Sequence, residues 1–257
     1  MERKAKRWQK RLQRRGFQCI LKQKTHSTND DAKSLLLSGA PHGAAVVALS
    51  QTGGRGRLDR VFSSETGGLY LSFIYHKPLP SQIAALTFTA ALACAEAIES
   101  LCEVKVGLKW VNDLYVDGKK VGGILTEGII CPETGALLGA IVGIGINVTN
   151  ELPASLLPTG TSLALSCKKP PKLFDLCQAV LARLTSAFER EVTVPKEAYA
   201  KRMLFVGEEL FAFDGKEEFA ATVLGIDEQG GLLVCTKDGA HRTLTAGEVT
   251  FHKENHS

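Results

Sequence analysis

The sequence predicts an α+β protein in two parts, a larger part that mixes strands with helices and a small β-barrel at the C-terminal end. Up to about residue 200, segments that alternate apolar and polar residues occur among segments with helical periodicity. From about Val206 onward the strands become short and are separated by tight turns at Asp214-Gly215, Gln229-Gly230-Gly231 and Asp238-Gly239, which is typical of a small barrel. A chain of 257 residues is long enough for both parts.

The spacing of apolar and capping residues predicts the helices of the larger part. Residues 2–15 predict a helix whose apolar residues Ala5, Trp8 and Leu12 share one face. Thr28, with Asp31 three residues later, resembles a capping box for a second helix that ends near Gly39. Two further helices are expected, one apolar on nearly all sides and one amphipathic, at Ser81–Leu101 and Leu173–Glu191.

The strands of the larger part follow from alternation and turn chemistry. Strands are expected at Val46–Leu49, Leu69–Tyr75 and Leu138–Val148. In the second of these, Leu69, Leu71, Phe73 and Tyr75 share one face. Lys105–Val116 and Val121–Glu127 predict a hairpin that turns at Asp117-Gly118, because both of these residues tolerate positive φ.

Basic residues are concentrated at the start of the chain. The net charge is +4, but eight bases and the acid Glu2 fall within the first fifteen residues, and without these the chain has 23 basic and 26 acidic residues, a net charge of −3. The body of the protein therefore offers no broad polyanion-binding surface. We interpret residues 1–24 as a basic arm that docks on its own protein, in preference to a nucleic-acid contact.

The cysteine pattern and the hydropathy indicate a cytoplasmic protein. The seven cysteines have no CxxC spacing, which is typical of reduced and mostly buried thiols. No apolar h-region follows the basic start, so a secretory signal is not expected. The longest apolar stretch, Ala136–Ile146, is too short for a membrane-spanning helix, which needs about 20 residues.

A glycine-rich and arginine-rich segment lies between two predicted strands. In Gly53-Gly54-Arg55-Gly56-Arg57 the glycines let the backbone approach a ligand, and the guanidinium groups suit carboxylate or phosphate oxygens. A flexible surface loop is the alternative. The position between two strands favours anion binding, because ligand loops sit at the ends of rigid elements.

Two further segments offer room beside a strand. In the hairpin, alternation places Lys120 on one face with Gly122 and Ile124, so the ammonium has a hollow beside it. Exposure of Lys120 to solvent is the alternative.

In Val142–Asn147, the residues Gly143, Gly145 and Asn147 share the face opposite the core. That face predicts a slot for a flat group, with close packing of a helix as the alternative.

Five segments, taken in order, resemble the biotin protein ligases. They are Ser27-Thr28-Asn29, Gln51 through Arg57, Lys109 through Leu114, Lys120 through Leu125, and Gly143 through Asn147. Thr161-Ser162-Leu163 and the final barrel are also similar to that family. The resemblance implies a mixed β-sheet flanked by helices, related to the lipoate ligases and the class II aminoacyl-tRNA synthetases, followed by an SH3-like barrel. The expected division is a basic arm at 1–24, a catalytic domain at 25–200 and the barrel at 205–257.

The resemblance also implies the roles of site residues. The catalytic cations would be Arg55, Arg57 and Lys120. Biotin would be bound by Ser27, Thr28, Asn29, Gln51, Gly54, Arg55, Arg57, Lys120, Gly123 and Gly143. ATP would be bound by Arg55, Arg57, Phe62, Lys109, Asn112, Asp113, Lys120 and Asn147. Asp113 is the candidate magnesium ligand.

The implied activity is ATP-dependent ligation of biotin, through biotinyl-5′-AMP, to a lysine of the biotin carboxyl carrier domain of acetyl-CoA carboxylase or a related carboxylase. ATP, Mg²⁺ and biotin are the expected small molecules, with no tightly bound prosthetic group. No DNA or membrane partner is expected. Only about 24 residues precede the first motif, which is too few for a DNA-binding helix-turn-helix domain. The sequence leaves open whether the protein forms a homodimer. A lipoate or octanoate ligase and a non-catalytic nucleotide-binding module are the alternatives.

The chain departs from the family pattern at four positions. Leu58 and Asp59 stand where the family often has Arg and Gly, which predicts weaker phosphate binding. Phe62 stands where a Trp is common, and Val111 stands where a Pro usually precedes the Asn-Asp pair. Leu58 and Asp59 thus lose one positive charge and gain a negative one, whereas neither Phe62 nor Val111 removes a reactive group.

Overall fold

The computed structural model describes residues 2–58, 60–79, 83–214, 216–245 and 248–250, so Asp59 lies outside the described residues. The helices, with one short 3₁₀ turn η1, are α1 (Glu2–Gln13), α2 (Thr28–Leu37), α3 (Ala84–Glu99), η1 (Ala154–Leu156), α4 (Leu163–Ser166), α5 (Leu173–Phe188) and α6 (Lys196–Ala200). The strands of the larger part are β1 (Cys19–Lys22), β2 (Ala45–Ala48), β3 (Leu69–Tyr75), β4 (Gly107–Lys109), β5 (Asp113–Val116), β6 (Lys119–Ile130) and β7 (Leu137–Ile146).

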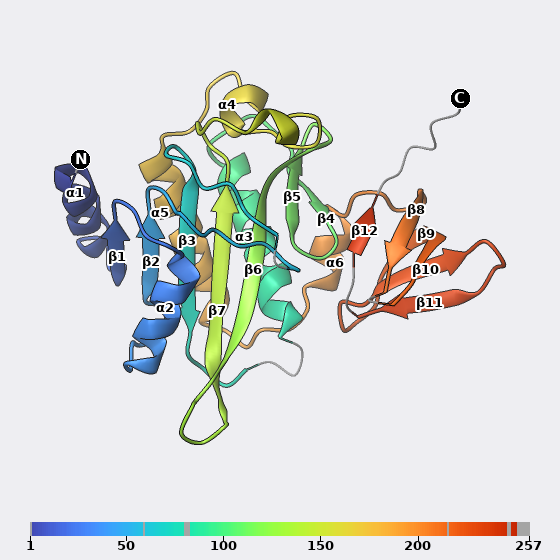
Figure 1. The fold of residues 1–257 in the computed structure, drawn as a ribbon, viewed down its shortest axis with the longest axis horizontal. Coiled ribbons are helices and arrows are strands. Elements are labelled where there is room, and N and C mark those ends of the chain that lie inside the picture. The colour runs from blue at the N-terminus through green and yellow to red at the C-terminus, as the bar shows by residue number, and fades with distance from the viewer. Residues whose placement is uncertain (1, 59, 80–82, 215, 246–247, 251–257) are drawn as a thin grey trace.

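These strands form one mixed sheet (Figure 1). Within the described residues its order is β1-β2-β3-β7-β6-β5-β4. The first pair is parallel and the others are antiparallel. The sheet is covered on one face by α3 and α5 and on the other by α2 (Figure 1). The predicted mixed sheet flanked by helices is therefore confirmed.

Each face of the sheet has its own apolar core. The larger core includes Leu69, Leu71, Phe73 and Tyr75 of β3, which confirms the predicted face, and the Ala-rich helix α3 is buried on nearly all sides. The smaller core lies under α2, where Ile74 packs with residues that include Leu36 of the helix. Because β3 is buried on both faces, polar residues on its α2 side need partners within the protein.

The hairpin region differs from the sequence prediction in one respect. The turn is correct, with φ of 48° at Asp117 and 73° at Gly118. The single strand expected at Lys105–Val116 is wrong, because the chain reverses at residues 110–112 and β4 pairs antiparallel with β5. Alternation alone does not reveal such a reversal, because the residues on both sides of it keep a strand-like pattern.

Helix α2 begins as expected, but not through a capping box. Ser27 is the N-cap residue, and its side chain makes no capping hydrogen bond. The Asp31 carboxylate instead accepts from Lys22 Nζ at 2.8 Å and from Thr25 Oγ1 at 2.6 Å. The capping box at Thr28 and Asp31 is therefore wrong, since Asp31 ties α2 to the segment before it.

Helix α1 is docked on the rest of the protein. Its predicted apolar face, Ala5, Trp8 and Leu12, is buried, and Trp8 stacks edge-on with Phe174 of α5 at 5.4 Å between ring centroids. Gln9 Oε1 accepts from the backbone N–H of Leu21 at 3.0 Å. β1, which ends at Lys22, belongs to the same sheet as the strands after residue 24, and the expected division of the chain stays a prediction.

The C-terminal part is an all-β module, as predicted. Its described strands are β8 (Glu209–Phe213), β9 (Glu218–Ile226), β10 (Leu232–Thr236), β11 (His241–Leu244) and β12 (Glu248–Thr250). They form an antiparallel sheet in the order β11-β10-β9-β8-β12. The module contacts the larger part where Trp110 Nε1 donates to Gly230 O at 2.9 Å.

All seven cysteines are free thiols, and four of them are buried, as the sequence predicts. Burial raises the pKa of the Cys19 thiol to about 11. Throughout the part of the chain that the structure describes, every helix is too short or too polar to span a bilayer.

Candidate active site

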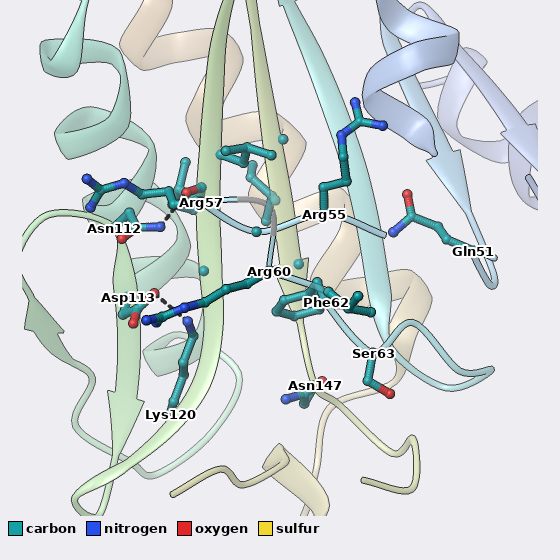
Figure 2. A pocket seen from close by; sticks show the side chains of 18 of the residues that line it. Gln51, Arg55, Arg57, Arg60, Phe62, Ser63, Asn112, Asp113, Lys120 and Asn147 are labelled. Atoms are coloured by element: carbon teal, nitrogen blue, oxygen red, sulfur yellow. Dashed lines mark hydrogen bonds and ion pairs between the residues drawn. The ribbon is translucent and has the colours of Figure 1, made fainter. Parts of the chain in front are cut away.

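A cavity of about 260 Å³ lies over the sheet, on the face that carries α2 (Figure 2). Its floor is formed by β6 and β7, with Ile124, Gly143 and Gly145 among the lining residues. Its sides come from the start of α2, the 54–62 segment, Asn112 and Asp113 at the start of β5, and the segment 152–160. Residues far apart in the sequence therefore meet around one cavity.

One side of the cavity, which we call the α2 wall, is neutral and hydrogen-bonded. It consists of Ser27, Thr28, Asn29 and Gln51. Gln51 Oε1 accepts from the Thr28 N–H at 2.7 Å and from Thr28 Oγ1 at 3.1 Å, while its Nε2 donates to Ser64 Oγ at 2.9 Å. The amide of Gln51 is thus held in one orientation before any ligand arrives.

A buried serine connects the rest of the α2 wall to the sheet. Ser72 Oγ, on β3, lies 2.8 Å from Thr28 Oγ1 and 2.5 Å from Asn29 Oδ1. The Asn29 amide also donates to Glu127 of β6. Gly143 provides the space for this side chain, because a Cβ at Gly143 would lie 2.3 Å from Asn29 Oδ1.

The predicted slot beside β7 is present and holds an aromatic ring. A Cβ at Gly145 would lie 2.6 Å from Phe62 Cε1, so the ring lies against the bare backbone of the strand. Phe62 also meets the ring of Tyr70 edge-on at 6.4 Å. At Gly143 the bare strand is filled by Asn29 of α2, which is the close helix packing that the sequence left as the alternative, and at Gly145 it is filled by Phe62.

The opposite side of the cavity, which we call the β6 wall, carries charge. It consists of Asn112, Asp113, Lys120 and Gly123. Lys120 Nζ lies 2.6 Å from Asp113 Oδ1, and Asn112 Nδ2 donates to Ile124 O at 2.8 Å. Figure 2 shows Arg60 reaching toward this ion pair from the 54–62 segment.

The hollow beside Lys120 is made by Gly123, so its predicted assignment to Gly122 is wrong. On β6, Gly122 pairs with Leu114 of β5, and Lys120 pairs with the next residue, Tyr115. Val121 is therefore left without a partner among the described residues of β5, as the extra residue of a bulge. A Cβ at Gly123 would lie 3.6 Å from Lys120 Cε, whereas one at Gly122 would meet Gly145 O. A bulge reverses the alternation that the prediction used.

Asn147 closes the far end of the slot as expected. Its Nδ2 donates to Thr161 O at 3.2 Å, and its Oδ1 accepts from Asn150 Nδ2 at 3.0 Å. The side chain is buried and fixed by these two bonds. The amide therefore helps to hold the 152–161 segment against the end of β7.

Arg55 is oriented differently from the other cations of the cavity. Its guanidinium pairs with Asp30 of α2, with Nη1 2.9 Å from Oδ2 and Nη2 2.6 Å from Oδ1. Hydrogen bonding from Arg55 lowers the pKa of the Asp30 carboxyl, and the pKa of Arg55 is raised by the same bond. Figure 2 shows Arg55 directed away from Lys120.

Comparison with known proteins identifies the family. Residues 21–147 match the Biotin/lipoate A/B protein ligase family, and residues 213–251 match the Biotin protein ligase C terminal domain. The chain is 34% identical over 229 residues to the bifunctional ligase/repressor BirA of Bacillus subtilis, covering 86% of this chain and 70% of that protein. The chain belongs to the biotin protein ligase family.

Two further relatives match over almost their whole length. The biotin--[acetyl-CoA-carboxylase] ligase of Paracoccus denitrificans is 30% identical, with 89% of this chain and 98% of that protein covered. The structure of biotin protein ligase from Aquifex aeolicus in complex with biotin and ATP has a TM-score of 0.78 and 31% identity, covering 90% of this chain and 97% of that chain.

Most residues that the biotin protein ligase resemblance predicts do line the cavity. The lining residues are Ser27, Thr28, Asn29, Gln51, Arg55, Arg57, Phe62, Asn112, Asp113, Lys120, Gly123, Gly143 and Asn147. Two predicted residues are not among them. Gly54 lies behind the wall, where a Cβ would meet Ser64 Oγ at 2.3 Å, and Lys109 lies on β4. Their ligand roles, like those of the others, stay predictions.

Sequence reasoning missed several residues of this biotin protein ligase cavity. They are Gly56, Arg60, Val61, Ser63, Ile124, Leu125, Ile144, Gly145, Leu152, Leu156, Thr159 and Gly160. Gly145 belongs to the predicted slot, but no motif assigns it to the site. The 152–160 residues carry no motif, and they reach the cavity because Lys120 N donates to Thr159 O at 2.9 Å and Lys120 O accepts from Thr161 N at 2.8 Å.

Proposed function

We propose that this chain activates biotin with ATP to biotinyl-5′-AMP and transfers the biotinyl group to a lysine of a carrier protein. The observation that carries the proposal is the arrangement of a neutral, pre-bonded α2 wall and a charged β6 wall across one cavity. The first suits a polar but uncharged ring, and the second suits phosphates. Relatives named as biotin ligases support the same assignment.

In the first step, a carboxylate oxygen of biotin attacks the α-phosphorus of ATP, and pyrophosphate leaves. Two anions approach each other, so fixed positive charge at the reacting groups is the main requirement. Lys120 on β6 and Arg57 on the 54–62 segment would supply it. In the second step, a neutral lysine amine attacks the acyl carbonyl carbon and loses one proton to solvent, and AMP leaves with the phosphate oxygen of the broken anhydride bond.

Magnesium would accompany ATP. The described residues contain no group of three His, Cys, Asp or Glu side chains that could hold a metal ion. Mg²⁺ commonly takes one or two carboxylates and completes its shell with phosphate oxygens and water. Asp113 is the carboxylate in a suitable place, so the site fits a metal that arrives with ATP, whose charge would neutralise the phosphates.

A lipoate or octanoate ligase is the nearest alternative, and the α2 wall argues against it. The ureido ring of biotin offers N–H donors and a carbonyl acceptor, whereas the dithiolane of lipoate offers neither. Ser27, whose hydroxyl makes no capping bond, and the Gln51 amide lie at the cavity. Buried polar groups reject a substrate that leaves them unpaired, by about 10⁴ in favourable cases.

Pyrophosphate exchange into ATP tests the proposal directly. The full chain is incubated with labelled pyrophosphate, ATP and Mg²⁺ together with biotin, lipoate or octanoate. Exchange that depends on biotin supports the proposal. Exchange with lipoate or octanoate alone would assign the chain to the alternative ligases, and ATP binding without exchange would indicate a non-catalytic nucleotide-binding module.

A further inference from the structure

The 54–62 segment is a hairpin that carries charged and aromatic side chains into the cavity. Phe62 N donates to Gly54 O at 2.9 Å, Gly56 N donates to Arg60 O at 2.7 Å, and Arg55 forms a bridge with Val61. The hairpin is defined here by its described residues, without residue 59. The position of the hairpin therefore determines where Arg57, Arg60 and Phe62 lie over the cavity.

The Arg55 side chain ties this hairpin to two other elements. It forms the bidentate pair with Asp30 on α2, and its Nη2 lies 3.7 Å from Glu127 Oε1 on β6. A guanidinium held by two parallel N–H···O bonds has a fixed orientation as well as a favourable energy. Arg55 therefore connects the hairpin to both the helix and the floor of the cavity.

The two carboxylates are themselves fixed. Asp30 follows directly after the α2 wall, and Glu127 accepts from the Asn29 amide, which lies against Ser72. The anchor for the hairpin is thus continuous with the neutral wall of the cavity. A shift of Asp30 or Glu127 would be transmitted to Arg55, and from there to the residues that the hairpin places over the ligand.

We propose that Asp30 and Glu127 are positioning residues, which hold the hairpin over the cavity through Arg55. On this view Arg55 anchors the hairpin and is not a charge applied to the reacting phosphate. The consequence is that loss of Asp30 leaves activation of the acid largely intact but shortens the time for which the adenylate is retained. This part of the inference rests on the proposed adenylate-forming function.

The first test measures retention and formation separately. Labelled biotinyl-5′-AMP is formed on the full chain, and its release is followed after addition of excess unlabelled biotinyl-5′-AMP. Asp30→Asn is expected to release it about fivefold faster, an effect at the upper end for a half-exposed ion pair. Single-turnover formation should stay within about threefold of the parent, and Asp30→Glu should restore part of the retention.

Combining variants separates an anchor from a catalytic charge. If Asp30 acts through Arg55, then Asp30→Asn/Arg55→Gln should release the adenylate no faster than Arg55→Gln alone. Glu127→Gln should give a smaller effect, which adds to that of Asp30→Asn. Additive effects of Asp30→Asn and Arg55→Gln, or a fall in formation with Asp30→Asn as large as that in release, would overturn the proposal.

A second test does not depend on activity. Trypsin cleaves after arginine, so the initial rates of cleavage after Arg57 and Arg60 in the ligand-free full chain report how firmly the hairpin is held. Asp30→Asn should raise both rates about fivefold, as a half-exposed pair allows. Asp31→Asn is the matched control, because Asp31 lies on the same helical turn but pairs with Lys22 at 2.8 Å and with Thr25 in place of the described hairpin residues.

If trypsin cleaves the parent and Asp30→Asn at equal rates, Asp30 does not hold the hairpin, even if biotin ligation is confirmed. Conversely, a parent that makes no adenylate from biotin would refute the proposed function. In that case the cleavage rates would still decide whether Asp30 holds the hairpin.

Discussion

The two walls of the cavity are built in opposite ways. In the α2 wall, Thr28, Asn29 and Gln51 are uncharged, and their polar groups are bonded to one another, to serines behind them or, for the Asn29 amide, to Glu127. In the β6 wall, Lys120 and Asp113 are charged, and the Lys120 side chain keeps 38% of its surface exposed. Both walls are bonded before a ligand binds, but the α2 wall offers neutral groups, whereas the β6 wall holds a partly exposed ion pair whose charges a ligand can engage.

This difference suggests a division between selectivity and rate. Polar groups that are already oriented lose little freedom on binding, and they reject ligands that cannot match them. Charges that stabilise a transition state act where the charge of the substrate changes during the reaction. Damage to the β6 wall should therefore slow adenylate formation, whereas damage to the α2 wall should weaken or broaden recognition of the acid.

The largest effect is expected from Lys120→Ala. Removing one preorganised electrostatic donor should lower single-turnover adenylate formation by about 10²- to 10³-fold. Biotin binding, measured by calorimetry without ATP, should change much less. Lys119→Ala is the control, because Lys119 Nζ donates to Leu157 O at 2.9 Å and does not line the cavity. If Lys120→Ala forms the adenylate at nearly the rate of the parent, Lys120 does not stabilise the transition state.

A smaller effect, on the other wall, is expected from Gly143→Ala. The added methyl would lie 2.3 Å from Asn29 Oδ1, and Asn29 cannot withdraw without losing its bonds to Ser72 and Glu127. Each buried polar group left unpaired costs about 1–3 kcal/mol, so biotin affinity should fall by about 10- to 100-fold.

The control for Gly143→Ala is Gly128→Ala on β6, where a Cβ would meet, among the described residues, only the side-chain ends of Ile83 and Leu137 at 3.2 and 3.3 Å. Calorimetric titration with biotin measures both variants. If Gly143→Ala binds biotin normally, Asn29 does not shape the ligand site.

A still smaller effect is expected from Gln51→Leu, which removes the acceptor of the Thr28 N–H and the donor to Ser64. The preference for biotin over lipoate in pyrophosphate exchange should fall by about tenfold, because the wall loses one oriented polar group. The exchange rate at saturating biotin should change little. A preserved preference with a reduced rate would show that selectivity and rate are not divided between the walls.

The sequence predicts local features of the fold well and non-local ones less well. The face of β3, the buried helix α3 and the Asp117-Gly118 turn depend on neighbouring residues, and all three are confirmed. The reversal between β4 and β5 depends on which strands pair. Alternation within one segment does not contain that information.

The same distinction applies to the site. Order and spacing of the motifs locate both walls, but the bulge at Val121 moves the hollow from Gly122 to Gly123. The partner of Arg55 was also missed, because Asp30 is 25 residues away and has no motif of its own. Such contacts follow from the packing of α2 on the sheet, which no single segment specifies.

The smallest effect on either wall is expected from changes in helix α1, which docks beside β1 at the edge of the sheet. Leu12 is fully buried, so Leu12→Ala should lower the free energy of unfolding by about 2–5 kcal/mol. Lys10→Ala, on the exposed side of the same helix, should change it by no more than about 0.5 kcal/mol. Thermal and urea unfolding measure both variants. At a temperature where Leu12→Ala is still folded, its biotin affinity and its rate of pyrophosphate exchange should equal those of the parent, because α1 contributes no residue to either wall. A change in either quantity would show that the edge of the sheet influences the cavity, and the contrast between the walls would then depend on the whole sheet.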